Sequence, residues 1–107
     1  MNGFQVTFFT EQGVHQDSHA IDKWLMEIAK LLGIGGVTVA AGVQGMGRDG
    51  KLHSAHFVEL ADQPIEITMV MTDEQYRTLF ERLEQEKANL FYVKTAAEFG
   101  VVGEATS

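Results

Sequence analysis

The sequence predicts an α+β fold of the ferredoxin-like type, in which an antiparallel βαββαβ sheet carries two helices on one face. Two observations predict it. A segment with helical periodicity lies between two extended segments, and this strand, helix, strand order occurs twice. The chain has 107 residues, of which 45% are hydrophobic, which is enough for one small core and too little for two. We therefore expect a single domain over residues 1–107.

The first half of the pattern begins with a strand at residues 4–10, which are rich in aromatic and β-branched side chains. A helix is predicted over residues 17–32, with Asp17 or Ser18 as its N-cap and a stop at Gly33. A second strand should begin near Gly36. The apolar stripe of the helix comprises Ile21, Trp24, Leu25, Ile28, Leu31 and Leu32.

The second half begins with an extended segment at 56–62 and a buried strand that Pro64 opens and that ends before Thr72. Residues 72–75 (TDEQ) form a capping box, which predicts a second helix that runs to about Lys87. A last strand is expected at 90–95 and a flexible tail at about 97–107. The apolar stripe of this helix comprises Tyr76, Leu79, Phe80 and Leu83, and we expect these side chains and Trp24 in the core.

Two helices on one face leave the other face of the sheet without a cover. The strands offer Phe, Val, Ile and Met side chains that we expect on both faces, so the open face would expose apolar surface. Contact with further copies of the chain is the simplest cover in a protein this small. The sequence therefore predicts a homo-oligomer.

Composition excludes several classes of function. The net charge of −7 disfavours nucleic acid as a partner, and the absence of cysteine excludes disulfides and thiolate chemistry. No apolar run is long enough to span a bilayer and no signal peptide is evident, so we expect a cytoplasmic protein. No Gly-x-Ser-x-Gly or Walker motif is present, so we predict no catalytic residues and no enzyme activity. Two histidine pairs, His15 with His19 and His53 with His56, have spacings that could pair metal ligands on a helix, but they fall in or beside predicted turns and we predict no metal site.

The glycine-rich segment at 42–55 (GVQGMGRDGKLHSA) has two interpretations. Asp49 and Gly50 between apolar runs are typical of a hairpin turn. Alternatively, the amides of Gly45 and Gly47 can turn toward an anion, and Arg48 adds a permanent positive charge. Both interpretations can hold at once.

Glu66 interrupts an otherwise apolar strand, where an unpaired carboxylate is costly to bury. Three alternatives remain open for it. The side chain lies at a strand edge or faces solvent, it meets a cation of a neighbouring subunit, or it binds a ligand.

Residues 33–48 (GIGGVTVAAGVQGMGR) and 64–75 (PIEITMVMTDEQ) resemble the PII signalling proteins and their PII-like relatives. The resemblance covers about residues 4–95. It implies a homotrimer that binds adenine nucleotides between subunits and signals to a protein through a T-loop, here at about 48–60. By this resemblance Thr38 would bond the adenine, Glu66 and Thr68 would line the base pocket, and Gly45, Met46, Gly47 and Arg48 would wrap the phosphates.

Departures from the family's pattern lower the number of cations. The second phosphate loop is replaced by residues 86–89, where Lys87 is the one cation, Asp62 stands where a lysine is expected, and the terminal arginines are missing. The T-loop is short and has no tyrosine for uridylylation. Because ATP carries the most charge, we predict that ADP or AMP binds more tightly than ATP.

The resemblance also suggests a second ligand and a partner. Some PII-like relatives are tied to inorganic-carbon uptake and carboxysomes, so bicarbonate is the first candidate for a small second anion. A transporter or an enzyme of inorganic-carbon metabolism is then the expected protein target, and no further cofactor is required. The alternative is a trimeric metal-binding or scaffolding relative of the copper-tolerance type that binds no nucleotide.

Overall fold

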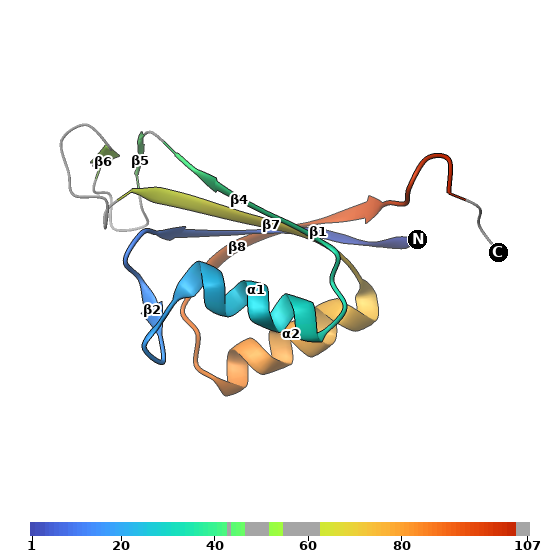
Figure 1. Cartoon of the computed structure of the whole chain (residues 1–107), viewed down its shortest axis with the longest axis horizontal. Helices are drawn as coiled ribbons and strands as arrows, with labels where there is room; N and C mark the ends of the chain where they lie inside the picture. Colours follow the sequence, from blue (N-terminus) through green and yellow to red (C-terminus); the bar gives the residue numbers. More distant parts are fainter. Residues whose placement is uncertain (43, 47–51, 55–62, 105–107) are drawn as a thin grey trace.

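The computed structural model describes residues 1–42, 44–46, 52–54 and 63–104 (Figure 1). Within these residues, the elements follow the predicted order with two short hairpins added. They are β1 (Asn2–Glu11), β2 (His15–Gln16), β3 (His19–Ala20), α1 (Ile21–Leu31), β4 (Gly36–Ala41), β5 (Gln44–Met46), β6 (Leu52–Ser54), β7 (Pro64–Thr72), α2 (Asp73–Gln85) and β8 (Phe91–Glu98).

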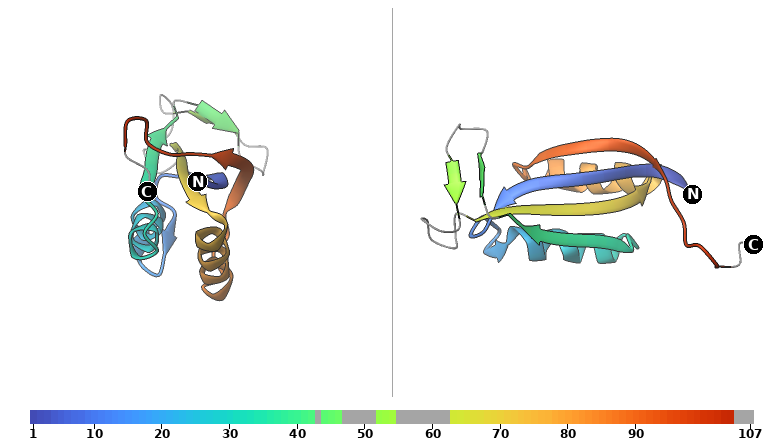
Figure 2. Two further views of the ribbon diagram at one scale, coloured as in Figure 1. Left: turned by 90° about the vertical axis from the view of Figure 1, so that its right-hand side faces the viewer. Right: turned by 90° about the horizontal axis from the view of Figure 1, so that it is seen from above.

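The four long strands form one antiparallel sheet in the order β4-β7-β1-β8. Both helices lie side by side on one face of this sheet, and no described segment covers the other face (Figure 2). This arrangement confirms the ferredoxin-like α+β fold. The described ends of the chain lie at one end of the sheet, and both short hairpins, β2–β3 and β5–β6, lie at the opposite end (Figure 1). We call this the hairpin end, and the uncovered face the bare face.

The core lies between the sheet and the helices. Alternate side chains of the two central strands point into it, and Val6 and Phe8 of β1 are fully buried there with Ile67 and Met69 of β7. Phe and Val side chains occur on both faces, as expected, but the Ile and Met side chains of β7 all lie on the core side, so the expectation is wrong for them. The reason is the period of two along a strand, which sends Glu66, Thr68 and Val70 to the bare face.

The beginning of α1 differs from the prediction. Asp17 and Ser18 have φ angles of 49° and 70° and form the two-residue turn of the β2–β3 hairpin. The helix therefore starts at Ile21, and Ala20 is its N-cap without a side-chain hydrogen bond. Polar residues at 17 and 18 fit a hairpin turn as well as a cap, and the pairing of residues 15–16 with 19–20 decides between them.

Both helices end in a Schellman motif. After α1, Gly33 has a φ angle of 75°, and the amides of Gly33 and Ile34 donate to the carbonyls of Lys30 and Ala29. The predicted stop at Gly33 is therefore confirmed. After α2, Lys87 occupies the same left-handed position with a φ angle of 55°, and its amide donates to Glu84 while that of Ala88 donates to Leu83.

The capping box of α2 is confirmed and extends to α1. Thr72 accepts from the amide of Gln75, and the Gln75 side chain accepts from the amide of Thr72 at 2.9 Å. The Nε2 group of Gln75 also donates to the carbonyls of Leu32 and Gly33, at 3.3 and 3.1 Å. One side chain thus joins the start of α2 to the end of α1.

Other expectations are met in part. Trp24 is buried, and Tyr76 and Phe80 pack half-buried against the core as predicted. Leu31 is 77% exposed, because it lies on the outer side of α1 while Ala29 takes a core position. The strand β8 extends to Glu98, two residues into the expected tail. The extended segment predicted at 56–62 lies outside the described residues.

Candidate functional site

Three threonines form a row across the centre of the bare face. Thr38 of β4 lies directly opposite Thr68 of β7, and Thr68 lies directly opposite Thr7 of β1. The hydroxyl oxygens of Thr7 and Thr68 are 3.1 Å apart, at hydrogen-bond distance. Thr38 is exposed, and the other two are half-buried. The row offers hydroxyl groups that can donate and accept hydrogen bonds.

The next row lies two residues closer to the hairpin end and contains Glu66. Ala40 of β4 is opposite Glu66, Glu66 is opposite Phe9 of β1, and Phe9 is opposite Phe91 of β8. The Phe9 and Phe91 rings have centroids 5.8 Å apart and are 36% and 46% exposed. Glu66 itself is exposed. Its carboxylate therefore faces solvent in this single chain, which is one of the alternatives that the sequence left open.

Both rows have a polar half on β4 and β7 and an apolar half on β1 and β8, and we use these names for the two halves of the bare face. Within these rows, the side chains on β4 and β7 are small or polar, namely Thr38, Ala40, Glu66 and Thr68. On β1 and β8 they include Phe9, Phe91 and Val93, and the last is 45% exposed. No Lys or Arg lies on the bare face among the described strand residues, because Lys94 lies on the helix side, where its ammonium is 4.0 Å from the ring centroid of Tyr76.

The described residues of the glycine-rich segment lie at the hairpin end, just beyond the Glu66 row. Its described part is the β5–β6 hairpin, in which Gly45 pairs with His53 and Met46 with Leu52. Gly47 and Arg48 lie outside the described residues, as do Asp49 and Gly50. The hairpin joins the sheet where the Gly42 amide donates to the Pro64 carbonyl.

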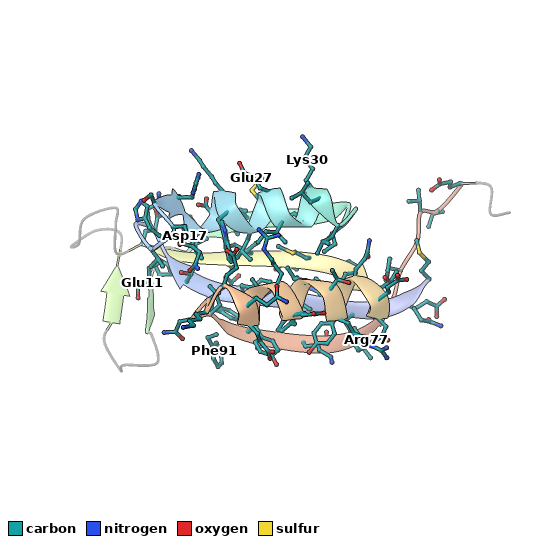
Figure 3. All side chains as sticks on the ribbon, turned by 90° about the horizontal axis from the view of Figure 1, so that it is seen from below. Glu11, Asp17, Glu27, Lys30, Arg77 and Phe91 are labelled. Carbon is teal, nitrogen blue, oxygen red and sulfur yellow. The ribbon has the colours of Figure 1, made fainter. Side chains whose placement is uncertain are left out.

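Lys87 lies at the same end of the sheet, in the helix layer. It lies in the connection between α2 and β8, four residues before Phe91, and Figure 3 shows Phe91 and Glu11 at the hairpin end. A left-handed backbone costs a residue with a Cβ roughly 1–2 kcal/mol, and glycine is the usual residue at this position of a helix end. Backbone strain of this kind is a pointer to function, since glycine would relieve it.

His15 and His19 do not point toward one another, and His56 lies outside the described residues. His15 pairs with Ala20 and His19 with Gln16, so the two imidazoles lie on opposite faces of the β2–β3 hairpin. Their Nδ1 atoms are bonded to the carbonyls of Gly13 and Asp17. No group of three potential metal ligands occurs among the residues that the structure describes.

A shallow groove lies between the helices, on the opposite side of the molecule from the bare face. It contains none of the predicted site residues and is lined by Ile28, Leu31, Leu32, Thr78, Glu81, Arg82 and Gln85. Neither described helix is long and apolar enough to cross a membrane.

The register thus brings Thr38, Glu66 and Thr68 together on the polar half of the bare face. It adds three residues that sequence reasoning missed, namely Thr7, Phe9 and Phe91. These three residues lie next to the predicted site residues only because strands that are distant in the sequence pair with one another. No local motif marks them as members of the site. The hydroxyls and the carboxylate can bind a ligand rich in hydrogen-bond donors, and the lack of cations among the described strand residues disfavours a phosphate at these two rows.

Comparisons with known proteins agree with this architecture. A solved PII-like signalling protein from Thermus thermophilus is 19% identical, with a TM-score of 0.66 over 91% of this chain and 88% of that chain. CPII from Thiomonas intermedia, a nitrogen regulatory PII-like protein bound to ADP, AMP and bicarbonate, is 16% identical, with a TM-score of 0.61 over 91% and 89% of the two chains.

Sequence comparison supplies the family. No curated protein matches the chain significantly. The model of the family DUF190, described as "Uncharacterized ACR, COG1993", matches residues 3–97. The chain therefore belongs to the DUF190 family, and its fold is that of the PII-like signalling proteins.

Proposed function

We propose that the chain is a cytoplasmic PII-like regulatory protein that senses an adenine nucleotide and signals to a protein target through its T-loop. The observation that carries the proposal is the convergence of Thr38, Glu66 and Thr68 on one half of the bare face, in a chain with a PII-like fold. The structures of CPII with ADP, AMP and bicarbonate support the choice of ligand.

The nucleotide would lie over the polar half of the bare face, with its phosphates toward the glycine-rich segment. Gly45, Met46, Gly47 and Arg48 are the proposed phosphate-binding residues, and Lys87 is a further cation at the same end. Its strained backbone supports this assignment, because a charge that binds a ligand is a reason to keep lysine where glycine would be more stable.

The preferred nucleotide would be ADP or AMP. The cations available for phosphate are Arg48, Lys51 and Lys87 in a chain of net charge −7. A triphosphate carries about four charges and is usually bound by several cationic side chains or a magnesium ion, so this deficit weighs most against ATP. Bicarbonate is the proposed second ligand beside the shorter phosphate chain.

The apolar half of the bare face would bury against other copies in a homotrimer. Phe9, Phe91 and Val93 are the exposed apolar side chains of this half, and contact with neighbouring subunits would remove them from water. The polar half, which includes the edge strand β4, then lies at the border of the subunit contact. The T-loop, at about 48–60, would contact the target, for which a transporter or an enzyme of inorganic-carbon metabolism is proposed.

Calorimetric titration tests the ligand. AMP, ADP and ATP with magnesium would be titrated with and without bicarbonate at fixed pH and ionic strength. We expect binding in the order that the charge argument gives, with ADP or AMP tighter than ATP, and a change in ADP affinity when bicarbonate is present. Tightest binding of ATP would contradict the charge argument. Identical ADP affinity with and without bicarbonate would contradict the proposal that bicarbonate is a second ligand.

Light scattering tests the assembly. A homotrimer of this 11.8-kDa chain has a mass of about 35 kDa. A monodisperse monomer at micromolar concentration would contradict the proposed assembly.

A further inference from the structure

The two rows of the polar half suggest which part of the nucleotide each one binds. We infer that the Glu66 carboxylate accepts hydrogen bonds from the ribose hydroxyls, so that the site selects ribonucleotides over deoxyribonucleotides. This inference rests on the proposed nucleotide-binding function and adds a specificity-determining residue to it.

The spacing of the rows is the first step. Thr38 and Thr68 form one row, and Ala40 and Glu66 form the next row toward the hairpin end. An antiparallel strand advances about 3.4 Å per residue, so the rows are about 7 Å apart. The strand β5 begins three residues beyond Ala41. Three groups therefore follow one another along β4 toward the hairpin end. They are the threonine hydroxyls, the Glu66 carboxylate and, beyond the polar half, the β5–β6 hairpin.

A nucleotide also has three parts in succession, namely the base, the ribose and the phosphates. With the base edge at the threonine row and the phosphates at the hairpin, the ribose falls over the row of Ala40 and Glu66. The reversed orientation would place the phosphates at the threonine row, on a surface without Lys or Arg among its described strand residues, where no positive charge offsets theirs. Charge therefore fixes the direction.

The chemistry of this row suits a sugar. An ionised carboxylate only accepts hydrogen bonds, and the two ribose hydroxyls both donate. Dinucleotide-binding folds use an acidic residue in the same way. Opposite Glu66 lies Ala40, whose small side chain leaves space over β4 at this level. If Glu66 instead bound the adenine amino group, the whole nucleotide would move one row toward the hairpin and leave Thr38 without a partner.

Paired titrations separate these possibilities. ADP, 2′,3′-dideoxy-ADP and GDP would be titrated into the unmodified protein, Glu66→Gln, Glu66→Ala and the control Glu98→Gln. The control removes a negative charge from the exposed end of β8, at the opposite end of the sheet. ADP and its dideoxy analogue carry the same charge, so the ratio of their dissociation constants cancels the general electrostatic effect of each substitution.

The unmodified protein should bind ADP about tenfold more tightly than dideoxy-ADP, which is the range of a hydrogen bond to a charged group. Glu66→Ala should bring this ratio close to one and leave the preference for ADP over GDP unchanged, while Glu98→Gln should change neither. Loss of the ADP over GDP preference with an unchanged ribose ratio would place Glu66 at the base and overturn the inference, as would equal losses for all three nucleotides. An unmodified protein that binds no adenine nucleotide would instead contradict the proposed function.

Discussion

On the helix side of the sheet, the Phe8 side chain is fully buried, while its neighbour Phe9 on the bare face is 36% exposed. Adjacent residues of one strand thus have different environments, because successive side chains point to opposite faces. The helix side is completed by the chain's own helices. The bare face has an apolar half that no described segment covers and a polar half that carries the candidate site. The comparison teaches that the buried core lies on one face of the sheet, while the residues of the proposed binding site lie on the other.

The largest effect of a substitution is expected on the stability of the helix side. Phe8 contacts Phe80 and Tyr92, with ring centroids 5.9 and 6.5 Å away. Phe8→Ala should lower the free energy of unfolding by about 3–5 kcal/mol, because it removes a fully buried ring and leaves a cavity. Urea denaturation at fixed protein concentration measures it. A loss below about 1 kcal/mol would mean that this face is not the main core.

A smaller effect, on ligand binding alone, is expected at Arg48. Arg48→Ala should weaken ADP binding by about 1.5–3 kcal/mol, the range for hydrogen bonds to a charged group, and should leave the unfolding free energy nearly unchanged. Calorimetry and urea denaturation of the same sample give both values. An unchanged dissociation constant would mean that the glycine-rich segment is a turn without a phosphate site.

The link between the helices is tested at Gln75. Gln75→Ala removes the capping-box acceptor and the two bonds to the end of α1, and should cost about 1–2 kcal/mol of stability. Gln75→Glu keeps the acceptor and places a carboxylate against the carbonyls of Leu32 and Gly33, so it should not restore stability. Gln85→Ala is the matched control, since Gln85 is exposed and its side chain donates a hydrogen bond to Glu81 within α2. Equal thermal stability of Gln75→Ala and the control would contradict the link.

Lys87 should show opposite effects on stability and binding. Lys87→Gly should raise the free energy of unfolding by about 1 kcal/mol, because glycine adopts the left-handed backbone without strain, and should weaken ADP binding. Lys87→Arg keeps both the charge and the strain and should change neither. If Lys87→Gly gains stability and binds ADP as before, the lysine has no part in the site.

The smallest effect per subunit is expected at Phe9. Phe9→Ala should weaken assembly by about 0.5–1 kcal/mol per subunit, because only the exposed part of the ring remains to be buried. Sedimentation over a range of concentrations measures this shift. Thr95→Ala, on the same face, is the control. An unchanged dissociation constant would show that another surface forms the subunit contact.

The sequence by itself determined the order of the two helices and the four long strands. Local patterns correctly predicted β1, the apolar face of α1, the stop at Gly33 and the TDEQ capping box. Each of these features depends on residues that are close together in the sequence. The sequence could not determine the start of α1, because Asp17 and Ser18 are equally suited to a helix N-cap and to a hairpin turn. Pairing between His15–Gln16 and His19–Ala20 favoured the turn.

Only the tertiary structure decided which side chains share a face. The register places Thr38 opposite Thr68, and Glu66 opposite Phe9, although these partners are 30 and 57 residues apart in the sequence. A shift of one residue in either pairing would exchange the buried and exposed sets. The candidate site on the bare face is thus a consequence of strand pairing, because a strand's own sequence fixes which residues alternate but not which face the helices cover.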